Sequence, residues 1–206
     1  MIDVEYLRHS GDDLAVVNAA RVSFESERDE FREGRDAKLI DFLARHKHKS
    51  PFNHAFVSFR CQAPVFIARQ LVKHEYLPWN EVSRRYVEGG LEFYFPALDD
   101  YRSQPDSVKQ GSGEALPLFK AVQVRAAFRY AVDTCEAAYL KALDCGLSRE
   151  QARMILPQSM MTSWVWSGSL YAFAKMCSLR VDSHAQRESS YVAQKVLDNL
   201  YALFPV

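Results

Sequence analysis

The sequence has no excess of charge of either sign, because 26 Lys and Arg residues balance 26 Asp and Glu residues among its 206 residues. Proteins that wrap nucleic acid or bind membranes through basic segments depend on a net positive field, so the balance argues against both partners. No run approaches the roughly 18 to 20 uncharged apolar residues of a membrane span. Residues 1–13 lack the basic and apolar regions of a secretory signal. We therefore expect a cytoplasmic protein, in the host cytoplasm if a virus encodes it.

Cysteine is scarce, and its four positions are widely spaced with no CxxC pair: Cys61, Cys135, Cys145 and Cys177. This spacing argues against a zinc ribbon, a thioredoxin-like site and a disulfide framework. We expect the four side chains to behave as small buried hydrophobes. None lies in the motif segments described below, and a nucleophilic cysteine needs an activating base or a lowered pKa. We therefore predict that none of the four is catalytic.

Apolar residues are plentiful, since 48% of the chain is hydrophobic and 13% is aromatic, beside 25% charged residues. These shares are typical of a soluble globular domain with a sizeable core. The sequence shows no internal repeat and no linker. We therefore expect a single domain over residues 1–206.

Alternating hydrophobic residues predict three strands in a mixed α and β order. They cover residues 2–6, residues 54–62 and residues 91–95, the last of which is ended by Pro96. Residues 99–114, rich in Ser, Gln, Asp and Gly, predict a long surface loop.

Capping signals and apolar periodicity predict the helices. Asp12 or Asp13 can cap a first helix, because its carboxylate can accept from backbone N–H groups of the first turn. Ser148 with Gln151 three residues later has the form of a capping box, and Pro157 is expected to end the helix that it opens. Further helices are predicted around residues 39–43, from Pro64 to residue 72, in two or three long segments after the loop, and from about Ser183.

Residues 68–86 concentrate groups that bind anions. On the helix from Pro64, a donor, a cation and an imidazole are expected to share one face, at Gln70, Lys73 and His74. After Pro78, six residues hold five polar groups: Asn80, Glu81, Ser83, Arg84 and Arg85. Such density at a helix end favours a phosphate or nucleotide ligand. A solvated basic helix followed by a loop is the alternative.

Three histidines gather in the segment HKHKSPFNH, at His46, His48 and His54. An HxH pair still needs further ligands, and no carboxylate or thiolate stands at ligand spacing nearby. We therefore predict no metal site here.

Two further arginines have unusual places in the predicted helices. Arg153, in QARMILPQ, lies within a predicted helix, and Arg180, in LRVDSHAQRE, lies just before the expected start of another. Arginines beside helix N-termini oppose the macrodipole, which favours an anionic partner. For either residue alone, a surface salt bridge is the alternative.

Six segments follow one another along the chain: KHKSPFNH, APVFIARQ, NEVSRRY, EFYFP, ARMILP and LRVDSHAQ. In this order the chain resembles the flavin-dependent thymidylate synthase family over nearly its whole length. The family signature has the form RHRxxSxNExSxRY, and residues 73–86 read KHEYLPWNEVSRRY. Lys73, Glu75 and Pro78 depart from it. The matching residues are His74, Asn80, Glu81, Ser83, Arg85 and Tyr86.

The resemblance implies a homotetramer whose active sites form between subunits, around FAD. It implies conversion of dUMP to dTMP, with methylene from methylenetetrahydrofolate and a hydride from flavin that NADPH has reduced. In this chemistry no enzyme cysteine adds to the pyrimidine. We expect an α+β fold in which a small antiparallel sheet packs with long helices, in a single domain with a helical lobe.

By position, the resemblance also implies the roles of individual residues. Arg180 would be catalytic, polarising the uracil so that its N3 proton is lost, because a guanidinium stays charged and forks onto adjacent atoms. The residues implied for dUMP are Gln70, Lys73, Glu81, Val82, Ser83, Arg84, Arg85, Arg153 and Arg180. Those implied for FAD are Ser23, His48, Ser50, Lys73, His74, Glu75, Glu81, Ser169, Tyr171 and Lys175.

The departures from the family pattern fall mainly on the flavin positions. The family's NAR segment is replaced by residues 169–171, and a following asparagine by Lys175. Together with Glu75, these changes remove cations and amides that would meet FAD. Lys175 can supply a positive charge in their place. We expect Glu75 to pair with a nearby cation, either Lys73 or Lys175.

Two other classes of function remain open. A sister enzyme on the same scaffold could act on UMP, or could leave a hydroxymethyl group by letting water finish the reaction. A nucleic-acid binder using RRYV and KHE is the non-enzymatic reading, against which the balanced charge counts. Bound oxidised flavin, which colours a protein yellow, discriminates between the enzyme and the binder.

Overall fold

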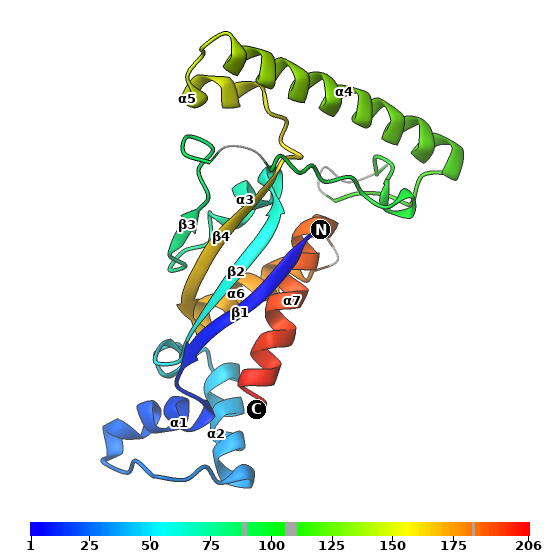
Figure 1. Ribbon diagram of the computed structural model, residues 1–206. Coiled ribbons are helices and arrows are strands. Elements are labelled where there is room, and N and C mark those ends of the chain that lie inside the picture. Colours follow the sequence, from blue (N-terminus) through cyan, green and yellow to red (C-terminus); the bar gives the residue numbers. More distant parts are fainter. Residues whose placement is uncertain (88–89, 106–110, 183) are drawn as a thin grey trace.

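The computed structural model describes residues 1–206 except 88–89, 106–110 and 183. Its centre is a four-stranded antiparallel sheet in the order β1-β2-β4-β3 (Figure 1). The strands are β1 (Asp3–Ser10), β2 (Phe56–Pro64), β3 (Trp79–Glu81) and β4 (Met161–Ser169). The predicted α+β class with a small antiparallel sheet is confirmed. The strands predicted at residues 2–6 and 54–62 are β1 and β2.

Strand β4 was not predicted from the sequence, although it pairs with β2 along its whole length. Trp166 lies opposite Phe59 and Trp164 lies opposite Cys61, and all four side chains are buried on one face of the sheet. The run Trp164, Val165, Trp166 interrupts the apolar and polar alternation by which a half-buried strand is recognised.

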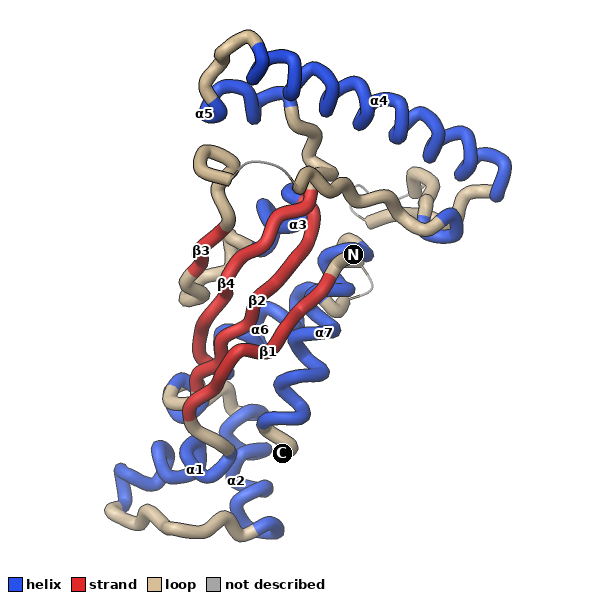
Figure 2. The backbone as a smooth tube through the Cα atoms, in the orientation of Figure 1, coloured by secondary structure: helices blue, strands red, loops and turns tan. Residues whose placement is uncertain are grey.

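The helices cover one face of the sheet and extend beyond both of its ends (Figure 2). Helices α3, α6 and α7 pack on the core face, whereas α1 and α2 lie at one end and α4 with α5 at the other. The bounds are α1 (Asp13–Arg21), α2 (Glu33–Arg45), α3 (Val65–Leu71), α4 (Leu118–Asp144), α5 (Arg149–Ala152), α6 (Leu170–Arg180) and α7 (Arg187–Leu203).

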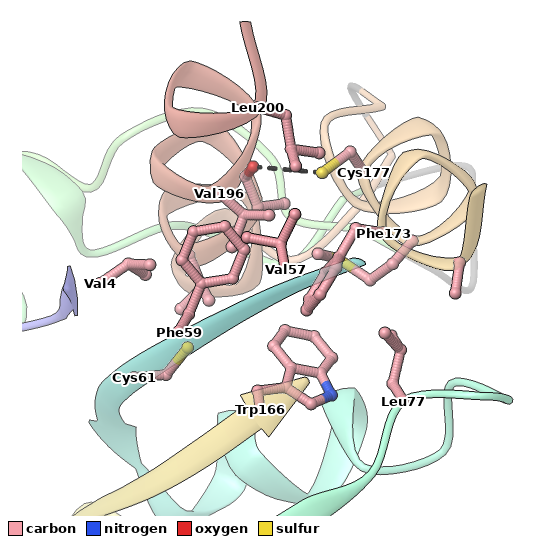
Figure 3. Close-up of a cluster of buried hydrophobic side chains, with 14 of the residues drawn as sticks. Val4, Val57, Phe59, Cys61, Leu77, Trp166, Phe173, Cys177, Val196 and Leu200 are labelled. Carbon is pink, nitrogen blue, oxygen red and sulfur yellow. Dashed lines mark hydrogen bonds between the residues drawn. The ribbon is translucent and has the colours of Figure 1, made fainter. Parts of the chain in front are cut away.

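An aromatic cluster forms the middle of the core between the sheet and α6 (Figure 3). The Phe173 ring meets Phe59 and Trp166 edge to face, with centroids 5.1 and 5.3 Å apart, and none of the three rings is exposed. Edge-to-face contact is a favoured geometry for aromatic pairs. The cluster therefore ties α6 to the two central strands.

Local signals place the starts of two helices as predicted. The Asp12 carboxylate accepts a hydrogen bond from the backbone N–H of Ala15 at 2.8 Å, so Asp12 caps α1. Pro64 directly precedes α3. Helix α3 ends at Leu71, however, so Lys73 and His74 lie beyond it and do not share a helical face with Gln70. That part of the prediction is wrong.

Three other predicted elements differ from the structure. Residues 91–95 form only an isolated bridge, between Phe93 and Met160, instead of a strand. Ser148 stands at the start of α5 but its side chain makes no capping bond, and α5 is a single turn followed by a 3-10 turn. Helix α7 starts at Arg187. The predicted start, Ser183, lies outside the described residues.

The predicted burial of the cysteines holds for two of the four. All are free; Cys61 and Cys177 are buried, Cys135 is half-buried and Cys145 is exposed. Cys145 directly follows α4, as its C-terminal cap. Within the predicted surface loop, of which residues 106–110 lie outside the description, Tyr101 is buried.

Helix α4, which has 27 residues, exposes several large apolar side chains. Leu118, Phe119, Val122 and Tyr130 fall on one side of the helix and are 48 to 76% exposed. Helix α4 packs mainly on α5 and on short turns near residues 98–100 and 153–155, away from the sheet (Figure 1). Within the described part of the chain, the helices all fall short of the length and hydropathy that a membrane crossing needs.

Candidate active site

A hollow of about 400 Å³, here called the β3 hollow, opens beside the end of β3. Five of the nine residues expected to meet a nucleotide line it: Glu81, Val82, Ser83, Arg84 and Arg153. Three further polar residues, Arg69, Gln158 and Thr162, line it and were not predicted. Arg69 lies in the ARQ segment of α3, but Thr162 belongs to β4, whose pairing the sequence did not reveal.

Hydrogen bonds to backbone carbonyls orient two of the three arginines that line the β3 hollow, Arg84 and Arg153. Arg153 Nε donates to the Glu150 carbonyl at 3.2 Å, and Arg84 donates to the Gly90 carbonyl at 3.1 Å. Arg85 lines neither this hollow nor the α6 hollow described below; its guanidinium lies 3.9 Å from the Glu150 carboxylate, and its backbone N–H donates to Ser83 Oγ. Guanidinium groups fixed in this way suit a phosphate, because little side-chain freedom remains to be lost on binding.

The Glu81 carboxylate stands at the edge of the same hollow. Thr162 Oγ1 donates to Glu81 Oε1 at 2.8 Å, and Trp79 Nε1 donates to Glu81 Oε2 at 3.2 Å. Each oxygen is therefore held by one neutral donor.

A second hollow, of about 560 Å³, lies near the end of α6 and is here called the α6 hollow. Gln70 and Arg180 line it together with Tyr101, Arg102 and Gln186, and the Gln70 amide donates to the Gln186 side-chain carbonyl. The Tyr101 hydroxyl and Arg102 Nε are buried without a hydrogen-bond partner among the described residues. Buried polar atoms of this kind are costly unless a ligand or water satisfies them.

Arg180 is oriented by a histidine within the same chain. Arg180 Nε donates to His74 Nε2 at 3.0 Å, which requires the His74 imidazole to be neutral. Burial lowers the pKa of His74, and the charges of Arg180 and Lys175 lower it further. The neutral form that accepts this hydrogen bond is therefore favoured.

The macrodipole argument for the two arginines is wrong. Arg180 is the last residue of α6, and Arg153 directly follows α5, so both lie at C-terminal helix ends. A cation is favourable there because of the partial negative charge of the helix end. Their place in the hollows, not a conflict with a helix dipole, marks them as ligand-binding candidates.

A third hollow, of about 210 Å³, lies between α2 and α6 and is here called the α2 hollow. Two residues implied for FAD line it, His48 and Tyr171, beside Lys47 and Lys49. Lys49 Nζ lies 5.6 Å from the centre of the Tyr171 ring, within the range of a cation–π contact.

The remaining flavin candidates have different surroundings. Lys175 Nζ lies 3.6 Å from Glu75 Oε2, so the predicted pairing of Glu75 with Lys175 is confirmed. Ser169 Oγ donates to Asn53 and accepts from the Ala172 N–H, which caps α6. Three exposed candidates, Ser23, Ser50 and Lys73, line none of the three hollows.

The buried thiols are poor nucleophiles. Burial raises the pKa of Cys177 to about 12, and it also raises the pKa of Cys61. A thiolate is the reactive form, so both side chains are inert at neutral pH. Among the described residues, no three His, Cys, Asp or Glu side chains gather as metal ligands would.

The β3 hollow thus gathers Ser83, Arg84 and Arg153, and the separate α6 hollow holds Arg180. A family model described as "Thymidylate synthase complementing protein" matches residues 5–206. The chain belongs to the flavin-dependent thymidylate synthase family.

Two relatives and one solved structure illustrate the similarity. The chain is 38% identical to a flavin-dependent thymidylate synthase of Gluconobacter oxydans, covering all of this chain and 69% of that protein. It is 35% identical to one of Treponema denticola, covering all of this chain and 78% of that protein. A UMP/dUMP methylase of Streptomyces cacaoi, PolB, solved with 5-Br dUMP, superposes with a TM-score of 0.91 at 34% identity, covering all of this chain and 92% of that one.

Proposed function

We propose that this protein is a cytoplasmic enzyme that methylates dUMP reductively to dTMP, with methylenetetrahydrofolate as carbon donor and FAD, reduced by NADPH, as hydride carrier. The observation that carries the proposal is the gathering of Ser83, Arg84 and Arg153 at one hollow, in a chain whose relatives are flavin-dependent thymidylate synthases. Fixed guanidinium groups and a hydroxyl are the donors that a nucleotide phosphate needs.

The α6 hollow supplies the groups that would act on the pyrimidine. A guanidinium is a permanent cation in proteins, and one edge of the Arg180 guanidinium is held by neutral His74. The other edge is available to stabilise negative charge that develops when the uracil loses its N3 proton. A preorganised cation of this kind lowers the barrier because it does not have to reorient during the reaction.

The residues present fit a flavin dinucleotide. The α2 hollow combines an apolar wall with Lys47, Lys49, His48 and the Tyr171 ring, and these suit an aromatic ring system and a pyrophosphate. The Glu75 carboxylate, which would repel a pyrophosphate, is paired with Lys175. When bound, FAD supplies the hydride chemistry that no side chain can supply.

We propose further that the working enzyme is a homotetramer whose sites form between subunits. The implied nucleotide residues are divided on one protomer, with Gln70 and Arg180 at the α6 hollow and Ser83, Arg84 and Arg153 at the β3 hollow. A symmetric assembly can bring the α6 hollow of one copy to the β3 hollow of another. The exposed apolar side of α4 offers surface for such an association.

The direct test is turnover by the purified, flavin-loaded protein. Incubated with dUMP, methylenetetrahydrofolate and NADPH, it should yield dTMP, identified by mass spectrometry, and omission of either co-substrate should abolish the product. The protein should be yellow when oxidised. A colourless protein that forms no dTMP after incubation with FAD would overturn the proposal.

A second acceptor is supported by one comparison. The Streptomyces cacaoi protein is a UMP/dUMP methylase, solved with both 5-Br dUMP and 5-Br UMP. We propose UMP as an alternative substrate, and a hydroxymethylated pyrimidine as an alternative product. Parallel assays with dUMP and UMP, with the products separated, decide between these outcomes by the ratio of kcat/KM values and by the mass added at C5.

A further inference from the structure

The β3 hollow contains one carboxylate, that of Glu81, among several arginines. The hydrogen bonds that hold this carboxylate suggest what it binds, and this inference rests on the proposed function. Glu81 is the last residue of β3 and lies opposite Trp164 of β4. Trp79 is two residues earlier on β3, and Thr162 is two residues from Trp164 on β4. Because side chains alternate along a strand, Trp79, Glu81 and Thr162 lie on the same face of the sheet.

That face is the core face of the sheet, and Glu81 stands where the core ends and the hollow begins. Trp79 stacks on Trp164 with ring centroids 4.3 Å apart, and Trp164 and Trp166 are buried. Thr162 is 8% exposed and lines the hollow. Both donors to Glu81 are therefore fixed by packing before any ligand arrives.

Both donors are also neutral, and this has a chemical consequence. An indole N–H and a hydroxyl fix the direction of the carboxylate without cancelling its charge and without using a cation of the hollow. A carboxylate can accept about four hydrogen bonds, so acceptor positions remain on Glu81. A carboxylate repels phosphate, so its ligand is a donor.

We propose that Trp79 and Thr162 are positioning residues that hold Glu81 to accept a hydrogen bond from an N–H or O–H group of the bound nucleotide. Arg84, Arg153 and Ser83 of the same hollow take the phosphate. Glu81 thus reads the uncharged part of the ligand, and its two donors set the direction from which the ligand's donor must approach.

The test is a double-mutant cycle on dUMP binding, measured by calorimetry on the flavin-loaded protein. Thr162→Val removes the hydroxyl at nearly constant shape and should weaken dUMP binding about tenfold, as expected for a hydrogen bond to a charged group. Thr162→Ser, which keeps the donor, should restore most of the affinity. Trp79→Phe should give a smaller loss, since its bond is longer.

The cycle separates positioning from a structural role. If Thr162 acts through Glu81, the double variant Thr162→Val with Glu81→Gln should bind dUMP no more weakly than Glu81→Gln alone. The matched control is Ser167→Ala, which removes a 2.9 Å hydrogen bond to Ser58 on the opposite face of the same strand and should leave dUMP affinity unchanged.

Three outcomes would overturn the inference. One is unchanged dUMP affinity in Thr162→Val, and another is a double variant whose losses multiply. The third is equal weakening by Ser167→Ala, which would show a general effect of loosening β4. A parent protein that binds no dUMP at all would instead overturn the proposed function, and the positioning role with it.

Discussion

The core face of the sheet and helix α4 both carry many apolar side chains, but they differ in what covers them. On the sheet, Phe59, Trp166 and Phe173 are fully buried by elements of the same chain. On α4, Leu118 and Phe119 are 66% and 63% exposed. The core is therefore complete within one chain, whereas α4 leaves apolar side chains exposed. The residues expected to bind the nucleotide are divided between two hollows, so in the proposed assembly another subunit would complete their site as well.

The largest expected effect is a loss of stability on changing the buried core between the sheet and α6. Phe173→Ala should lower the free energy of unfolding by roughly 3–5 kcal/mol, because it opens a cavity between α6 and the central strands. Urea denaturation should show the same loss at every protein concentration. Phe119→Ala on α4 is the matched control. A comparable loss of protomer stability in that control would break the distinction between the two regions.

The next effect in size is a loss of turnover, expected at the arginines of the two hollows. Arg180→Ala should lower turnover by roughly 10² to 10³ with little change in flavin content, as for other preorganised transition-state donors. Arg153→Ala should also lose activity by weakening nucleotide binding.

Mixing these two variants sharpens the comparison. If each site takes Arg180 from one subunit and Arg153 from another, co-expressed Arg180→Ala and Arg153→Ala chains should regain up to roughly a quarter of parental activity, since some mixed sites are intact. Neither variant should do so alone. Mixed assemblies with no recovery would mean that both arginines of a site come from one chain.

The next effect concerns α4 itself. Replacing Leu118 and Phe119 by Asp should weaken self-association by about 1 kcal/mol or more in total, because an unpaired carboxylate is costly in an apolar interface. Light scattering should then report smaller particles, while the far-ultraviolet circular dichroism of the protomer is retained. The control is Lys120→Ala, because Lys120 is also exposed on α4 and directly follows Phe119 but is not apolar. An unchanged assembly in the double variant would show that α4 is covered by something else.

Stability and turnover are expected to depend on pH through the hydrogen bond between Arg180 and His74, which lies within one chain. The pKa of His74 is lowered from 6.5, so folding favours its neutral form. As pH falls below 6.5, the unfolded chain gains the proton first, and the folded protein loses stability until the folded pKa is passed. Turnover should fall at lower pH, when protonated His74 can no longer accept from Arg180. His74→Gln accepts without titrating, so this acid limb should disappear from its kcat profile.

The smallest effect is expected at the exposed pair Glu75 and Lys175. Such pairs contribute roughly 0.2–1 kcal/mol, so Glu75→Gln should change flavin affinity only slightly. Glu75→Arg should not tighten flavin binding, because it leaves several cations crowded beside Lys175. The flavin dissociation constant at low and moderate salt measures both. Clearly tighter binding by Glu75→Arg would show that Glu75 is simply unfavourable to the cofactor.

The sequence by itself determined the features that depend on neighbouring residues. Alternation gave β1 and β2, the Asp12 carboxylate marked the start of α1, and the order of motifs identified the family. The sequence also predicted that Glu75 pairs with Lys73 or Lys175, because a carboxylate near an anionic ligand needs a cation, and the structure shows Lys175 as the partner. The strand predicted at residues 91–95 and the capping bond predicted at Ser148 did not form. Both predictions rested on local patterns, which tertiary packing can override.

The tertiary structure alone decided which distant groups meet. The hydrogen bond from Arg180 to His74 joins residues 106 positions apart, and that from Thr162 to Glu81 joins residues 81 positions apart. The division of the nucleotide residues between two hollows likewise depends on the pairing of β4 with β2 and β3. No periodicity along the chain encodes these contacts, because strand pairing and helix packing follow from burial of the whole core and not from the neighbours of any one residue.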